Sequence, residues 1–90
     1  MALRILSSPP PEPEEVAARM RQAIEAALPG ARAEVAARSA GHFEVEVVSA
    51  EFEGLPRLKQ QQRVYAAIAS LMSGDDAPVH AVDRLVTRAR

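Results

Sequence analysis

Two histidines, His42 and His80, are the residues of this chain best suited to bind a metal ion. Each stands at the start of a segment expected to be a β-strand, and neutral imidazoles are good ligands for iron, copper and zinc. Taken alone, each is more often an ordinary half-buried histidine than a ligand. Two imidazoles do not close a tetrahedral site, and the chain contains no cysteine. Any metal site built on them would therefore need ligands from another molecule, which points to a partner.

Catalytic candidates are few. No nucleophile elbow or comparable motif brings serine, histidine and aspartate together. Asp75 and Asp76, or Glu51 and Glu53, are the nearest approach to paired carboxylates. They fall in a helix-terminating loop and an exposed turn, where solvated side chains are the better interpretation. No phosphate-binding glycine pattern is present either. We therefore expect that the protein is not an enzyme.

The net charge is −1, which argues against a dedicated nucleic-acid or membrane-surface binder. Residues 1–53 carry nine acids and five bases, whereas residues 54–90 carry six bases and three acids. The simplest interpretation is a solvated, polarised surface. The alternative is a surface for a partner or a nucleic acid, formed by Gly54, Arg57, Lys59 and Arg63.

The location expected from the sequence is cytoplasmic. No segment approaches the roughly 18 apolar residues that span a membrane, and the first residues are too short for the apolar core of a signal peptide. The lack of cysteine fits a reducing compartment. The sequence does not distinguish a monomer from a homodimer.

The apolar pattern predicts one domain with the order helix, strand, strand, helix, strand. Residues 1–12 form a flexible Pro-rich lead-in, and residues 13–90 form the domain. The first helix begins near Pro13 and ends at Pro29-Gly30. Its buried stripe consists of Val16, Met20, Ile24 and Ala27/Leu28.

Two alternating segments joined by Ser39-Ala40-Gly41 predict an antiparallel hairpin with one wet face. The buried face of the hairpin carries Ala31, Ala33, Val35, Ala37, Phe43, Val45 and Val47, and His42 lies on the opposite face. Phe52 is expected to anchor the following turn to the core. The second helix covers residues 57–72, with Leu58, Gln61, Val64/Tyr65, Ile68 and Leu71/Met72 buried, and a third strand covers residues 79–86. We expect an α+β sandwich in which both helices pack on one face of a three-stranded mixed sheet.

Four segments, in this order and spacing, resemble the BolA family: His42–Ser49, Phe52–Gln61, Val64–Ala66 and Val79–Ala81. The shared pattern runs from a strand through an F-x-G turn into a basic helix and later reaches a strand-starting histidine. It covers about half of the chain. The resemblance implies a class II KH-like α-β-β-α-β fold.

The resemblance also implies a partnership with a monothiol glutaredoxin, in which the two proteins hold a [2Fe-2S] cluster. The glutaredoxin and its glutathione would supply sulfur ligands, and this chain would supply His80. The resemblance makes His42 the candidate second ligand. Imidazole in place of thiolate raises the potential of such a cluster, so the shared site suits cluster trafficking or iron and stress regulation.

Three features depart from the family pattern. The usual loop cysteine is absent, and Ser39 near its expected position is a poor iron ligand. Lys59-Gln60-Gln61 stands where many members have Arg-His-Arg, as in a bacterial subgroup, and we expect no counterpart of the family's frequent C-terminal helical extension. The alternative function is a KH-like nucleic-acid-binding transcriptional regulator. A KH domain clamps the nucleic-acid backbone with a G-x-x-G loop, and Gly54-Leu55-Pro56-Arg57 lacks the second glycine, so only weak DNA contacts are expected.

Overall fold

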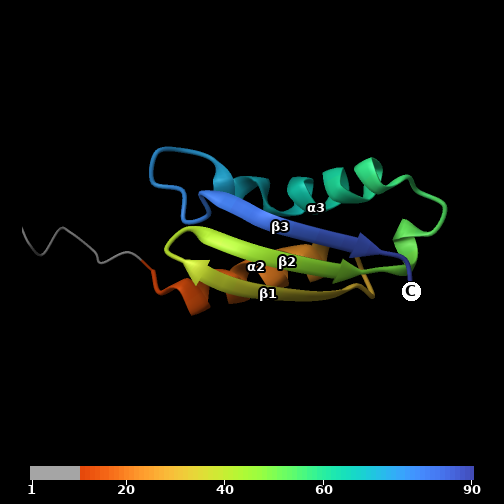
Figure 1. Cartoon of the computed structure of the whole chain (residues 1–90), viewed down its shortest axis with the longest axis horizontal. Coiled ribbons are helices and arrows are strands. Elements are labelled where there is room, and N and C mark those ends of the chain that lie inside the picture. Colours follow the sequence, from red (N-terminus) through yellow and green to blue (C-terminus); the bar gives the residue numbers. More distant parts are fainter. Residues whose placement is uncertain (1–10) are drawn as a thin grey trace, which may run out of the picture.

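Helix α2 (Pro13–Ala27) opens the part of the chain that the computed structural model describes, residues 11–90 (Figure 1). Proline stands in its first turn, and Glu14 and Glu15 complement the positive end of the helix dipole. The side chains of Val16, Met20, Ile24 and Leu28 are buried as predicted, together with Ala17, whereas Ala27 is exposed. Of the predicted flexible lead-in, residues 1–10 lie outside the described residues.

Three strands form one sheet in the order β1-β2-β3. Strands β1 (Arg32–Ser39) and β2 (His42–Val48) pair antiparallel as a hairpin, and β3 (Ala81–Arg88) pairs parallel to β2. The predicted mixed sheet is confirmed. The third strand begins two residues later than predicted, because the amides of Val79 and His80 donate to the carbonyls of Leu71 and Gly41 before the ladder starts.

Helix α3 (Arg57–Met72) connects β2 to β3 and runs back along the sheet (Figure 1). A short 3-10 helix, η1 (Ala50–Phe52), precedes it, and Phe52 is fully buried, as predicted. Helix α2 packs on β1, α3 packs on β3, and the two helices contact each other over the same core. None of the helices among residues 11–90 is long and apolar enough to cross a membrane.

The predicted buried face of α3 is wrong at two positions. Leu58 is 63% exposed and Tyr65 is 40% exposed, whereas Val64 and Ile68 are buried. At about 100° per residue, Leu58 and Tyr65 lie roughly 120° and 100° around the helix from Val64, on the same flank. The helix therefore turns the stripe of Val64 and Ile68 to the core, and the flank with Leu58 and Tyr65 remains at the surface.

Irregular pairing surrounds the start of β2. On one side, Ala37 pairs with Phe43 and Ser39 pairs with His42, so Arg38 is an extra residue in β1. On the other side the register shifts again: Phe43 pairs with Val82 and Glu44 with Arg84, which makes Asp83 an extra residue in β3. Bulges of this kind redirect side chains and are common beside functional sites. Here they flank His42 on both sides.

Candidate functional site

His42 and His80 meet at one end of the sheet, where β2 and β3 begin. His42 is the first residue of β2 and pairs with Ala81, the first residue of β3. His80 directly precedes β3, and its backbone N–H donates to the carbonyl of Gly41 at 2.8 Å. The two ring centroids are 6.5 Å apart, and the rings are nearly perpendicular, at 84°. The fold thus brings together two imidazoles that are far apart in the sequence. We call this region the histidine end.

His42 has a carboxylate partner that the sequence did not reveal. Its Nδ1 lies 3.1 Å from Oδ1 of Asp83, and both side chains are a little less than half exposed. An ionised carboxylate only accepts hydrogen bonds, so Nδ1 carries the proton in this pair. In the neutral ring, Nε2 then keeps a free lone pair, which is the arrangement usual for metal-binding histidines.

An ion pair lies next to His42 on the same face of the sheet. Nη2 of Arg38, the extra residue of β1, donates to Oε1 of Glu44 at 2.9 Å. This hydrogen bond lowers the pKa of the Glu44 carboxyl and raises the pKa of Arg38. Glu44 is thus paired with Arg38, and the carboxylate that forms the hydrogen bond with His42 is that of Asp83.

A surface pocket of about 770 Å³ adjoins His80. Its apolar lining includes Phe43 and Val16, and carboxylates from Glu12, Asp75 and Asp76 also border it. Asp75 and Asp76 are exposed, in agreement with the expectation that they are solvated. A partner that approaches His80 therefore meets a concave surface with negative charge at its border.

The described part of the chain supplies too few ligands for a metal ion. Among residues 11–90, no group of three or more histidine, cysteine, aspartate or glutamate side chains is placed to hold one. The histidine end offers the imidazole of His80, which is exposed, and that of His42, which is a little less than half exposed. A metal centre there would need its remaining ligands from a second molecule.

The predicted basic surface of Gly54, Arg57, Lys59 and Arg63 lies at the opposite end of the domain. All four residues are exposed, and three of them stand in the first half of α3. That helix has 16 residues, which is about 24 Å of length, and its C-terminal end leads toward the histidine end (Figure 1). The structure therefore separates the basic surface from His42 and His80.

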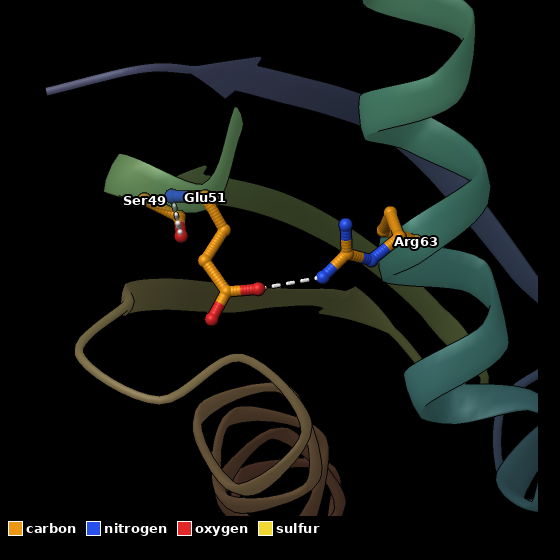
Figure 2. Close-up of polar contacts among 3 residues, drawn as sticks. All are labelled: Ser49, Glu51 and Arg63. Carbon is orange, nitrogen blue, oxygen red and sulfur yellow. Dashed lines mark hydrogen bonds and ion pairs between the residues drawn. The ribbon is translucent and has the colours of Figure 1, made fainter. Parts of the chain in front are cut away.

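Arg63 is engaged within the chain. Its Nη2 donates to Oε1 of Glu51 at 2.7 Å, and Ser49 caps η1 by accepting from the backbone N–H of Glu51 at 3.0 Å (Figure 2). This contact ties η1 to α3. Arg57 and Lys59 form no ion pair with the described residues, so they remain the available cations of the basic surface.

A polar bridge that the sequence did not predict holds the F-x-G turn. Nε2 of Gln60 donates to the carbonyl of Leu55 at 2.9 Å and approaches that of Phe52 at 3.4 Å. Oε1 of Gln60 accepts from the hydroxyl of Thr87, a buried residue of β3, at 2.8 Å. Gln60 thereby joins the turn, α3 and β3. The sequence carries no local signal for this bridge, because Thr87 is 27 positions away from Gln60.

A comparison with known protein families identifies the family of this chain. Residues 20–89 match the family described as BolA-like protein. The chain belongs to the BolA-like protein family. Among curated proteins, no match was found for this BolA-like chain.

Solved BolA structures share the fold. A BolA homologue from Coxiella burnetii is 34% identical, with 78% of this chain and 85% of that chain covered and a TM-score of 0.61. BolA1 from Arabidopsis thaliana is 26% identical over 81% of this chain and 89% of that chain, with a TM-score of 0.65. BolA1 from Mus musculus is 31% identical over 91% of this chain and 70% of that chain, with a TM-score of 0.62. The predicted family and fold class are confirmed.

Proposed function

We propose that this BolA-like protein is an adaptor that binds a [2Fe-2S] cluster jointly with a monothiol glutaredoxin and glutathione. The observation that carries the proposal is the convergence of His42 and His80 at one exposed end of the sheet. His80 is the first ligand and His42 the second. The role is binding and transfer in iron–sulfur trafficking or iron and stress regulation, not catalysis.

The donor set fits such a cluster. Two imidazoles on one side leave the other coordination positions to thiolates of the partner and of glutathione. Asp83 supports this use of His42, because its hydrogen bond to Nδ1 leaves Nε2 free to bind iron. When bound, imidazole in place of thiolate raises the reduction potential of the cluster. A partner that carries glutathione also agrees with a cytoplasmic, reducing location.

The experiment mixes this protein with a monothiol glutaredoxin that has been reconstituted with iron, sulfide and glutathione. We expect the visible absorption and circular dichroism of the cluster to change on mixing. His80→Ala should abolish the change and His42→Ala should reduce it. Lys59→Ala, which removes a charge from the distant basic surface, is the matched control and should leave the change intact. An unchanged spectrum with the wild-type protein would refute the proposal.

Weak nucleic-acid binding is the second candidate function. It is supported by Arg57 and Lys59, which are exposed at the start of α3 and unpaired with any described residue, next to the open turn at Gly54. Such contacts would be electrostatic and hence strongly dependent on salt. A titration with duplex DNA at several salt concentrations tests this function. Binding that falls with salt and with Arg57→Ala/Lys59→Ala supports it, and a flat response at low salt rules it out.

A further inference from the structure

Gly41 adjoins both histidines: it directly precedes His42 in the chain and lies against the ring of His80. It precedes β2 in the hairpin turn, is buried, and has a φ of +79°, in the left-handed region. Its carbonyl accepts the backbone N–H of His80 at 2.8 Å and that of Ala81 at 3.0 Å. These two bonds hold the backbone at the start of β3 against the hairpin turn, so the position of the main chain at His80 depends on Gly41.

The imidazole of His80 occupies the space that a side chain at position 41 would need. A Cβ atom added to Gly41 would lie 2.6 Å from Cγ and 3.0 Å from Cε1 of His80, and closer still to Nδ1. Carbon atoms make favourable contacts at about 3.5 to 4.0 Å, so the ring would have to withdraw by about 1 Å. The ring therefore lies directly against the main chain of Gly41.

The other glycines of the chain show that this contact is particular to Gly41. Gly30, Gly54 and Gly74 also have positive φ angles, of +83°, +79° and +90°. A Cβ atom at any of these three positions would meet nothing within 4 Å. Positive φ alone thus explains those glycines, whereas at Gly41 the imidazole of His80 adds a second requirement.

We propose that Gly41 is a positioning residue for His80: the absence of a side chain lets the imidazole lie against the turn, with its centroid 6.5 Å from that of His42. The inference deepens the proposed function and rests on it for the cluster. The placement of the ring itself is a property of the protein alone. A substitution at position 41 displaces the His80 ring but keeps the histidine. It therefore tests whether the position of the ring matters, whereas His80→Ala tests whether the ring itself is needed.

The test compares Gly41→Ala with Gly30→Ala. Both variants place alanine at nearly the same positive φ, so both lose a similar amount of stability from backbone strain. Gly30 precedes the end of β1 that pairs with the end of β2, far from the histidine end. Gly30→Ala therefore controls for the backbone strain without touching His80.

The first readout is NMR of the protein without metal. The wild type and Gly30→Ala should show nuclear Overhauser effects from the His80 ring to the α protons of Gly41, and Gly41→Ala should lose the corresponding contacts. If Gly41→Ala does not fold, Gly41→Asn makes the same test, because asparagine tolerates positive φ and still carries a Cβ atom. An unmoved His80 ring in either variant overturns the inference.

The second readout is the affinity for the glutaredoxin-bound cluster. We expect Gly41→Ala to weaken it by about 10- to 100-fold, the effect typical of residues that orient metal ligands, and Gly30→Ala to leave it unchanged. Equal affinities for the two variants would overturn the role of Gly41 in the cluster site. If the wild type itself does not alter the cluster spectrum, the proposed function fails, while the NMR comparison still decides whether Gly41 positions His80.

Discussion

The polar bridge of Gln60 gives a quantitative test of how the F-x-G turn is held. All buried side-chain nitrogen and oxygen atoms in the described part of the chain have hydrogen-bond partners. Gln60→Ala would remove the acceptor of the Thr87 hydroxyl, whose residue is 7% exposed, and the donor to the Leu55 carbonyl. The variant thereby leaves a buried hydroxyl unsatisfied where the first turn of α3 meets the end of β3.

The expected loss of stability is about 3 kcal/mol, within a range of about 1.5 to 4.5 kcal/mol. The bond to Leu55 contributes about 0.5 to 1.5 kcal/mol, and an unsatisfied buried hydroxyl costs about 1 to 3 kcal/mol. Proteins typically have a free energy of unfolding of about 5 to 15 kcal/mol, so this change removes a substantial part of the total stability. In a domain of this size, each kcal/mol lowers the melting temperature by about 4 to 8 °C, so a loss of about 3 kcal/mol gives a fall of about 12 to 24 °C.

Chemical and thermal unfolding followed by circular dichroism would measure the loss. The double variant Gln60→Ala/Thr87→Val should lose about 1 kcal/mol less free energy of unfolding than the two single variants lose together. The reason is that valine removes the hydroxyl that needs the acceptor. Gln62→Ala, an exposed site on the same helix, is the control and should change stability by less than about 0.5 kcal/mol. Additive single effects, or a Gln60 variant as stable as the Gln62 control, would refute the reasoning.

Three further predictions concern the core, the histidine end and the ion pair beside it. Phe52→Ala should cost about 3 to 5 kcal/mol in an unfolding titration, because the ring is fully buried; a loss below about 1 kcal/mol would show that Phe52 does not anchor the turn. Asp83→Ala should lower the fraction of neutral His42 that is protonated at Nδ1, measured by ¹⁵N NMR of the ring, and an unchanged fraction would contradict the hydrogen bond. The Arg38 hydrogen bond lowers the pKa of Glu44 below its ordinary 4.5, so the pair stabilises the fold above that pH and loses its effect as the pH falls through the lowered pKa. The melting temperatures of wild type and Glu44→Gln should therefore differ by a constant amount near neutral pH and converge in acid; a difference that grows in acid would contradict this sign.

The hairpin and the first helix could be predicted from the sequence because their signals are local. Alternation places Phe43, Val45 and Val47 on the buried face of β2, and Val16, Met20 and Ile24 recur at helical spacing. In each case a single apolar stripe is present, so only one face can be buried. The parallel third strand followed from the helical crossover that precedes it, and the resemblance to BolA proteins added the KH-like fold.

The buried face of α3 and the partners of the histidines were less accessible from the sequence. Helical spacing allows two apolar flanks on α3, one with Leu58 and Tyr65 and one with Val64. Ile68 fits either flank, so periodicity alone does not decide which one faces the sheet. Asp83 reaches His42 through the pairing of β2 with β3, across 41 positions of the sequence, and such pairing has no local sequence signal. Such long-range geometry depends on how elements pack, not on any local pattern.

The most direct test of the proposed function is to observe the nitrogen ligands of the cluster. Histidine in this chain alone would be labelled with ¹⁵N, and the reduced cluster in the complex with the glutaredoxin would be examined by pulsed electron-nuclear double resonance. We predict strong ¹⁵N couplings from two imidazoles in the wild-type complex. One of them should disappear in His42→Ala, and both should disappear in His80→Ala, because that variant abolishes the shared cluster site. A reduced cluster in that complex with no strongly coupled ¹⁵N would contradict the central claim that this protein supplies histidine ligands.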